Sequence, residues 1–186
     1  MILRPALLAA ALVFSSAASA QPSPQRFAIA GHGSLLLNVP TGWRVADKAV
    51  ANPPAVALSM FAPTGDSFNL QITAIWLEPA KRSGMTPEVI RERVQATASE
   101  LLPKSVEKEA KLIELRGKQA LGYYFSLTDR ESANTAGDYQ YIAEGTVTVG
   151  EAVTIFTFLH REPDTPAKDQ ALRMIKDAAY VMEKDK

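Results

Sequence analysis

The sequence predicts an α+β fold, in which about seven strands form a central antiparallel sheet that helices flank as an α/β/α sandwich. Three observations lead to this expectation. Apolar and polar residues alternate with a period of two through much of the chain, which is typical of strands with one buried face. Glycine-containing turns separate several of these runs, as in hairpins. Thr86-Pro87 and Thr165-Pro166 each precede apolar residues at helical spacing, which is typical of a helix start.

The N-terminus has the form of a cleavable signal peptide. Arg4 precedes an apolar core over residues 6–14, and Ala18-Ser19-Ala20 supplies a small-residue cleavage site. A membrane anchor is the alternative, but it needs about twenty apolar residues. We therefore expect a signal peptide over 1–20, cleavage near Ala20, and a periplasmic or secreted protein. A proline-containing disordered spacer over 21–25 and one globular domain over 26–184 are expected to follow.

The composition of the 186 residues argues against several classes of function. Lys plus Arg and Asp plus Glu both number 20, so no net charge attracts nucleic acid, and we expect no nucleic-acid partner. The absence of cysteine excludes disulfides, thiolate metal sites, cysteine nucleophiles and a lipid-anchoring cysteine. Because no later run approaches eighteen apolar residues, no membrane insertion is expected after cleavage.

The first half of the domain is expected to contain a hairpin and then further strands. The hairpin joins 27–30 to 35–39 through Gly31-His32-Gly33. Val39-Pro40-Thr41-Gly42 predicts a type I turn that places Trp43 in the core at the sheet edge. Residues 56–62 and 68–76 then alternate as two strands separated by a turn at 63–66.

The second half is expected to alternate helices with hairpins. A helix capped by Thr86 should end before Pro103, and a last helix should run from Thr165-Pro166 to near Glu183. Gly117-Lys118 and Gly150-Glu151 each suit a type II′ hairpin turn. The segment 152–159 is apolar on both faces, which predicts a central strand covered on both sides.

Two polar segments are candidate contact surfaces. Residues 130–138 form an expected surface loop, bracketed by tyrosines that serve either the core or an interface with a partner: Tyr123, Tyr124, Tyr139 and Tyr141. Residues 107–118 alternate acids and bases, which suits a solvated strand edge that resists aggregation. A partner could also recognise this charged edge.

The order of these elements, the Val39-Pro40-Thr41-Gly42-Trp43 corner and the strand pair around residues 61–65 resemble the PsbP-like family over residues 26–182. The resemblance implies an α/β/α sandwich with a central antiparallel sheet. Plant members of that family are extrinsic subunits of the oxygen-evolving photosystem, and a eukaryotic relative of the fold binds the GTPase Ran. The photosystem docking residues find no match here, so the resemblance assigns no residue a role.

Few residues in the chain suit catalysis. His32 is either an exposed turn residue or a ligand contact, and His160 with Glu162 is either strand-end decoration or part of a metal site that lacks donors. Asp129 and Glu131 are either solvated charges or an acid/base pair, and Trp76 is either a core residue or a stacking platform for a ligand. The sequence contains no G-x-S-x-G, H-E-x-x-H, phosphate-loop, nucleotide-turn or calcium-loop motif. The sequence therefore assigns no catalytic, cofactor-binding or metal residue, and we expect no cofactor.

We therefore expect a non-catalytic binding or accessory module whose partner is an envelope protein. The alternative is a carrier of a small apolar ligand in a pocket between sheet and helices. An enzyme is the third hypothesis, to be tested by a hydrolase screen with variants of His32 and His160.

Overall fold

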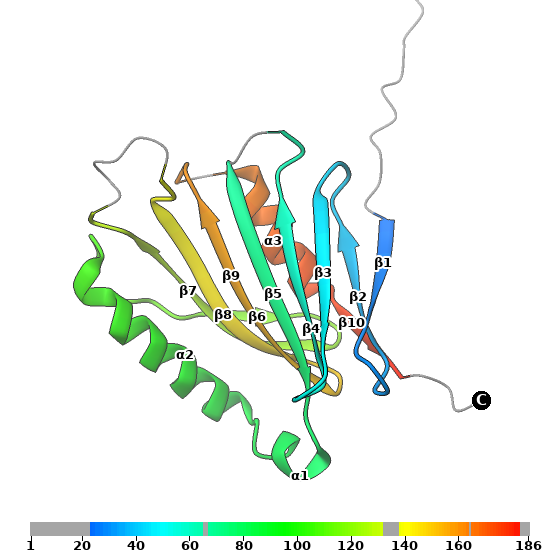
Figure 1. Ribbon diagram of the computed structural model, residues 1–186. Coiled ribbons are helices and arrows are strands. Elements are labelled where there is room, and N and C mark those ends of the chain that lie inside the picture. The colour runs from blue at the N-terminus through cyan, green and yellow to red at the C-terminus, as the bar shows by residue number, and fades with distance from the viewer. Residues whose placement is uncertain (1–22, 65–66, 132–137, 164, 183–186) are drawn as a thin grey trace, which may run out of the picture.

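The computed structural model describes residues 23–64, 67–131, 138–163 and 165–182, which form two antiparallel sheets and three α-helices (Figure 1). In spatial order the seven-stranded sheet contains β3 (Arg44–Val50), β4 (Ala55–Phe61), β5 (Phe68–Trp76), β9 (Ala152–His160), β8 (Tyr141–Val149), β7 (Ala120–Thr128) and β6 (Ile113–Arg116). The three-stranded sheet contains β1 (Ser23–Ala28), β2 (Ser34–Val39) and β10 (Ala179–Val181). The helices are α1 (Pro79–Arg82), α2 (Pro87–Leu101), the 3-10 helix η1 (Leu102–Lys104) and α3 (Pro166–Lys176). The predicted α+β fold with a central antiparallel sheet is confirmed.

The large sheet buries its two faces against different elements. On one face, which we call the α3 face, residues such as Leu70 and Phe156 form the main core with α3 and the small sheet. On the other, the α2 face, α2 packs Ile90 and Val94 against Phe125 of β7 in a second cluster. The cover of the α3 face is therefore part helix and part sheet, which departs from a strict layer of helices.

The helix α2 begins and ends where the sequence predicts. The Thr86 hydroxyl accepts the Val89 N–H at 3.4 Å, Pro87 is the first helical residue, and η1 carries the chain through Pro103. Proline lacks an N–H and fixes φ, so it fits the first turn of a helix and disfavours continuation at the other end.

The expectation that the central strand β9 is covered on both sides holds only in part, because Val153 is 5% exposed but Ile155, on the same face, is 40% exposed. A helix with its side chains is about 10 Å wide and neighbouring strands are about 4.8 Å apart, so one helix covers about two strands. The contacts of α2 fall mainly on β7 and β8, and the middle of β9, with the neighbouring parts of β5 and β4, lies uncovered beside it (Figure 1). Ile155 of β9 faces this side and is 40% exposed.

The last helix is shorter than predicted, because it ends at Lys176 and the chain continues as β10. The Asp177 N–H closes the helix by donating to Arg173, and Tyr180 then pairs with Leu35 of β2. The apolar residues after Lys176 fit a helix stripe or a strand equally well. They form a strand because the edge of β2 is available for pairing. Residue 183, the predicted end of the helix, lies outside the described residues.

The predicted spacer over 21–25 is wrong for its last three residues, which belong to β1. Ser23 pairs with Val39 and Pro24 with Asn38 of β2. Ladder hydrogen bonds join backbone groups and need no apolar side chain, and an edge strand such as β1 tolerates proline. The predicted signal peptide over 1–20 and residues 21 and 22 lie outside the described residues.

Two of the predicted turns have different geometry. Trp43 N–H donates to the Pro40 carbonyl at 3.2 Å and Gly42 has φ 83°, so the turn lies one residue later than predicted and is of type II, with glycine where φ must be positive. Gly117 N–H donates to the Ala120 carbonyl at 2.8 Å, which makes Lys118-Gln119 the turn and contradicts the predicted Gly-Lys turn. Gly117 serves packing instead, because a Cβ there would overlap the Lys176 carbonyl oxygen.

Candidate functional site

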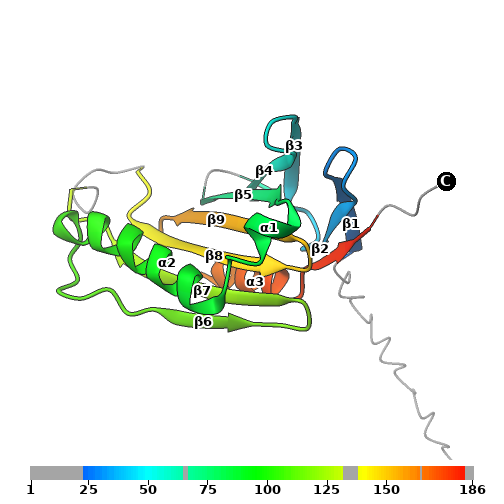
Figure 2. The ribbon, with the colours of Figure 1, turned by 90° about the horizontal axis from the view of Figure 1, so that it is seen from below.

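The β1–β2 turn, the end of β5, α1 and the β8–β9 turn come together at the lower end of the large sheet in Figure 1; Figure 2 looks onto this end and shows α1 over it. His32, in the β1–β2 turn, stacks on Trp76 of β5 with ring centroids 3.8 Å apart and 17° between planes. Trp76 Nε1–H donates to Glu151 Oε2 at 3.3 Å, and Arg82 Nη1 of α1 lies 3.0 Å from the same oxygen. We call these four residues the end cluster: His32, Trp76, Arg82 and Glu151.

The end cluster attaches the small sheet to the large one. The Tyr180 hydroxyl of β10 donates to the His32 carbonyl, and Tyr180 N–H donates to Gln119 Oε1 at 2.9 Å. Burial and the nearby Glu151 raise the Tyr180 pKa, against a smaller opposite effect of Arg82, so the hydroxyl keeps its proton and donates. His32 is therefore not a solvated turn residue, and Trp76 stacks on a side chain of the protein.

Sequence reasoning singled out His32 and Trp76 but missed Arg82 and Glu151. Nothing in the sequence relates the α1 segment to the β8–β9 turn, so no local signal could have found that ion pair. Among the described residues, no group of three His, Asp or Glu side chains could hold a metal ion.

His160, the second predicted candidate, is 1% exposed at the end of β9. Its ring lies between Tyr141 and Phe158, with centroids 5.3 and 5.1 Å away, and its Nδ1 is 2.5 Å from the Glu162 carbonyl oxygen. The prediction that His160 only decorates the end of the strand is therefore wrong, because its ring is buried between other aromatic side chains. Glu162 meets it through the backbone and keeps its side chain exposed, so the structure does not bring the two together as metal ligands.

The carboxylates near the 130–138 loop also do not converge. Asp129 Oδ1 accepts the Glu131 N–H at 2.9 Å, and the Glu131 side chain is exposed. Glu107, expected on a solvated edge, accepts the Thr128 N–H at 2.9 Å and the Thr128 hydroxyl at 2.8 Å. Burial acts to raise the Glu107 pKa, but these hydrogen bonds outweigh it and lower the pKa.

The uncovered part of the α2 face carries small and polar side chains around one large apolar residue, Ile155. Pairing aligns Ser59, Gln71 and Thr157 in one row and Ala57, Thr73 and Ile155 in the next. We call these six residues, on β4, β5 and β9, the open half-face. Ile155 and Gln71 are exposed, and its other residues are intermediate in exposure.

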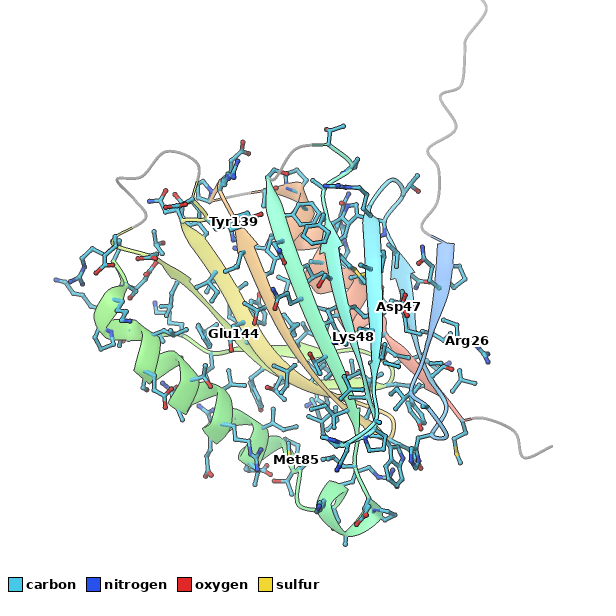
Figure 3. The ribbon with its side chains drawn as sticks, viewed as in Figure 1. Arg26, Asp47, Lys48, Met85, Tyr139 and Glu144 are labelled. Carbon is cyan, nitrogen blue, oxygen red and sulfur yellow. The ribbon has the colours of Figure 1, made fainter. Side chains whose placement is uncertain are left out.

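Glu144 borders the open half-face, opposite Thr157 in the ladder. Figure 3 shows it on β8 beside the uncovered strands, and Tyr139 near the upper end of that strand. Burial raises the Glu144 pKa, because the charged form loses hydration in its half-buried position.

A small pocket of about 150 Å³ lies where the C-terminal end of α2 meets the sheet. Apolar side chains and two tyrosines line much of it: Leu101, Leu127, Ile142, Leu159, Tyr139 and Tyr141. Leu159 belongs to the α2 face of β9, so the pocket continues the open half-face. The Arg161 guanidinium carbon lies 5.4 Å from the centroid of the Tyr139 ring. Pockets for drug-sized ligands have about 300–1,000 Å³, so this one suits a single side chain or a small group.

The four tyrosines around the 130–138 loop therefore separate. Tyr139 and Tyr141 line the pocket, Tyr123 packs against the α2 cluster, and Tyr124 packs against Phe156 on the α3 face. Residues 132–137 of the predicted loop lie outside the described residues.

No family model and no curated protein matches the chain. A crystal structure of a protein from Bacteroides thetaiotaomicron VPI-5482 is similar, with a TM-score of 0.53 and 13% sequence identity. The match covers 82% of this chain and 47% of that one, so the chain spans about half the length of that protein. This likeness shows a shared fold. Within the described part of the chain, no helix has both the length and the apolar character needed to cross a bilayer.

Proposed function

We propose that the protein is a non-catalytic binding or accessory module of the bacterial envelope, periplasmic or secreted after cleavage near Ala20. One observation carries the proposal: Ile155, on the central strand of a seven-stranded sheet, is 40% exposed. Antiparallel sheets can leave part of a face open to solvent, and an open area that combines an apolar side chain with hydrogen-bonding groups can accept a partner.

The chemistry of this surface favours a protein partner. Ser59, Gln71 and Thr157 offer hydrogen-bonding groups in one row across three strands, and the adjoining pocket has the size for one anchoring side chain. Tyr139 with Arg161 at the pocket rim adds the residue types that dominate binding energy at interfaces.

Membership of the PsbP-like family is part of the proposal. It is supported by the Val39-Pro40-Thr41-Gly42-Trp43 corner and by a central antiparallel sheet with a helix on each face. The leader-like residues 1–20 support export, and an envelope protein is accordingly the proposed partner.

The test is site-specific photo-crosslinking in the native envelope. Ile155→p-benzoylphenylalanine places a photoreactive group on the open half-face. Met182→p-benzoylphenylalanine is the matched control, because Met182 is also apolar and is 64% exposed, next to the small sheet. A saturable adduct from position 155 alone supports the proposal. No adduct, or equal adducts at both positions, contradicts it.

The pocket also supports a second candidate, a carrier of a small apolar ligand. Its leucine-rich lining suits such a ligand, and its 150 Å³ limits the ligand to a short chain. A specific ligand at a hundredfold excess over its Kd would stabilise the fold by about 2.7 kcal/mol. Thermal unfolding with short-chain fatty acids, with Leu159→Trp to fill the pocket as control, distinguishes a carrier from a binding module.

A further inference from the structure

The outer edge of β6 has backbone groups available for another strand. No described strand pairs with this side of β6. The hydrogen bond from Gly117 N–H to Ala120 fixes the ladder pattern, in which alternate residues turn their N–H and C=O groups to opposite sides. Ile113 and Leu115 therefore bond to β7, and the N–H and C=O groups of Glu114 and Arg116 face outward.

A groove of about 530 Å³ runs between this strand and α3 on the α3 face. Its lining includes Ile113, Leu115 and Tyr124 from the sheet and Leu172, Arg173 and Lys176 from the helix. Ile113 is 45% exposed and Leu172 half-buried, so the groove has an apolar floor that the described residues leave open.

The two ends of the groove differ in charge. Lys176 lies beside Gly117, past the end of β6, and Asp169 lies near Tyr124, which pairs with Ile113 at the start of β6. The helix thus runs in the same direction as β6, with its acid at the start of the strand and its cations near the strand end.

The cations of α3 are available to a ligand. Arg116 is occupied, because its Nε lies 2.5 Å from Glu114 Oε1. Arg173 and Lys176 are exposed and form no ion pair with the described residues. Neighbouring cations beside an apolar surface favour a carboxylate.

We infer that the β6 edge and its groove bind an extended segment of a partner protein as an additional antiparallel strand. The bound segment carries an acidic residue that is followed two positions later by an apolar residue. Alternate side chains of the segment face α3. The acidic residue lies opposite Leu115, near Arg173 and Lys176, and in an antiparallel strand the second residue after it lies opposite Ile113, beside Leu172.

A second copy of this chain suits the edge less well. Its β6 would present Ile113 and Leu115 on the α3 face, without a carboxylate.

This inference goes beyond the proposed function, since β6 and the open half-face are separate surfaces. Crosslinking from position 155 can fail while the β6 edge binds peptide, and the reverse also holds, so the two experiments fail independently.

The test uses the mature chain and the acetylated, amidated peptide TVTETITVT, with amide hydrogen exchange as the readout. We expect saturating peptide to slow exchange of the Glu114 and Arg116 amides at least tenfold. The isomeric peptide TVTITVTET, in which no apolar residue follows the glutamate, is expected to bind at least tenfold more weakly. N-methylation of the two threonines that flank the glutamate should abolish protection, since these residues would bond to β6.

A charge exchange tests the α3 cations. Arg173→Glu with Lys176→Glu should weaken TVTETITVT at least tenfold and strengthen TVTKTITVT, with circular dichroism to verify the fold. Absence of protection at millimolar peptide would overturn the inference, as would equal binding of the two isomeric peptides. Protection of Glu114 and Arg116 that rises with protein concentration alone would assign the edge to a second copy and also overturn it.

Discussion

The imidazole of His32 lies face to face with the indole of Trp76, 3.8 Å between ring centroids, and this contact joins the β1–β2 turn to the end of β5. The two rings belong to different sheets, so their contact helps fix how the sheets are placed relative to each other. Glu151 holds the indole through its Nε1–H and is itself paired with Arg82.

His32→Ala should lower the free energy of unfolding by about 1 kcal/mol, the usual contribution of an aromatic pair beyond its buried area. His32→Phe retains a stacking ring and should lose less. Urea unfolding monitored by tryptophan fluorescence measures both variants. Equal stability of His32→Ala and the native protein would show that the stack contributes nothing.

Glu144→Gln should stabilise the protein at neutral pH. Because burial raises the Glu144 pKa in the folded state, the native protein loses stability as pH rises from the unfolded-state value, 4.5, through the raised folded value. Below that window the carboxyl is protonated in both states, and the stability difference between variant and native protein should be smallest. Urea midpoints at pH 4 and pH 7 check the sign; an advantage of the variant that grows on acidification would contradict it.

Glu107→Gln should have the opposite pH dependence. The Glu107 pKa is lowered in the folded state, so its contribution to stability is present above 4.5 and is lost as pH falls through the folded value. Loss of the charge-assisted hydrogen bonds to Thr128 should cost about 1 kcal/mol at pH 7 for this partly exposed group. The same urea series measures it, and Glu109→Gln, at an exposed residue of the same segment, is the control.

Gly117→Ala should destabilise the protein by about 2 kcal/mol, in the range of overpacked sites. The new methyl group would overlap the Lys176 carbonyl and push the end of α3 away from β6. Gly84→Ala is the matched control, because its Cβ would make an ordinary 3.4 Å contact with the Lys81 carbonyl. Thermal unfolding compares the two; similar losses would show that α3 adjusts without cost.

Ile155→Ser should cost about 1–2 kcal/mol, because the 40% exposed side chain buries only part of its apolar area. Phe156→Ala, at the next residue, should cost about 3–5 kcal/mol because Phe156 is fully buried. Chemical denaturation of the two variants tests whether the α2 face at β9 is open. A loss for Ile155→Ser as large as that of Phe156→Ala would mean that the open half-face is part of the core.

Local chemistry explains the elements that the sequence predicted correctly. The Thr86-Pro87 start of α2 depends on a cap and a fixed φ within a few residues, and the alternation in β4 and β5 reflects one buried face. Both signals lie within a short stretch of chain. The turn at Gly150 is equally local, since its φ of 55° favours glycine.

Where the structure or exposure of a residue depends on distant segments of the chain, the sequence did not predict it. Ala179–Val181 forms a strand because β2 offers an edge, and Ile155 is exposed because α2 reaches only β7 and β8. The open half-face, the end cluster and the β6 groove each combine residues from distant segments. By itself the sequence determined the class of fold, most of its strands and the starts of its long helices, because hydrogen bonding, φ preference and apolar period act between near neighbours. Which surfaces remained uncovered, and which charged groups met there, was decided only by the tertiary structure, because burial and ion pairing depend on every segment that packs nearby.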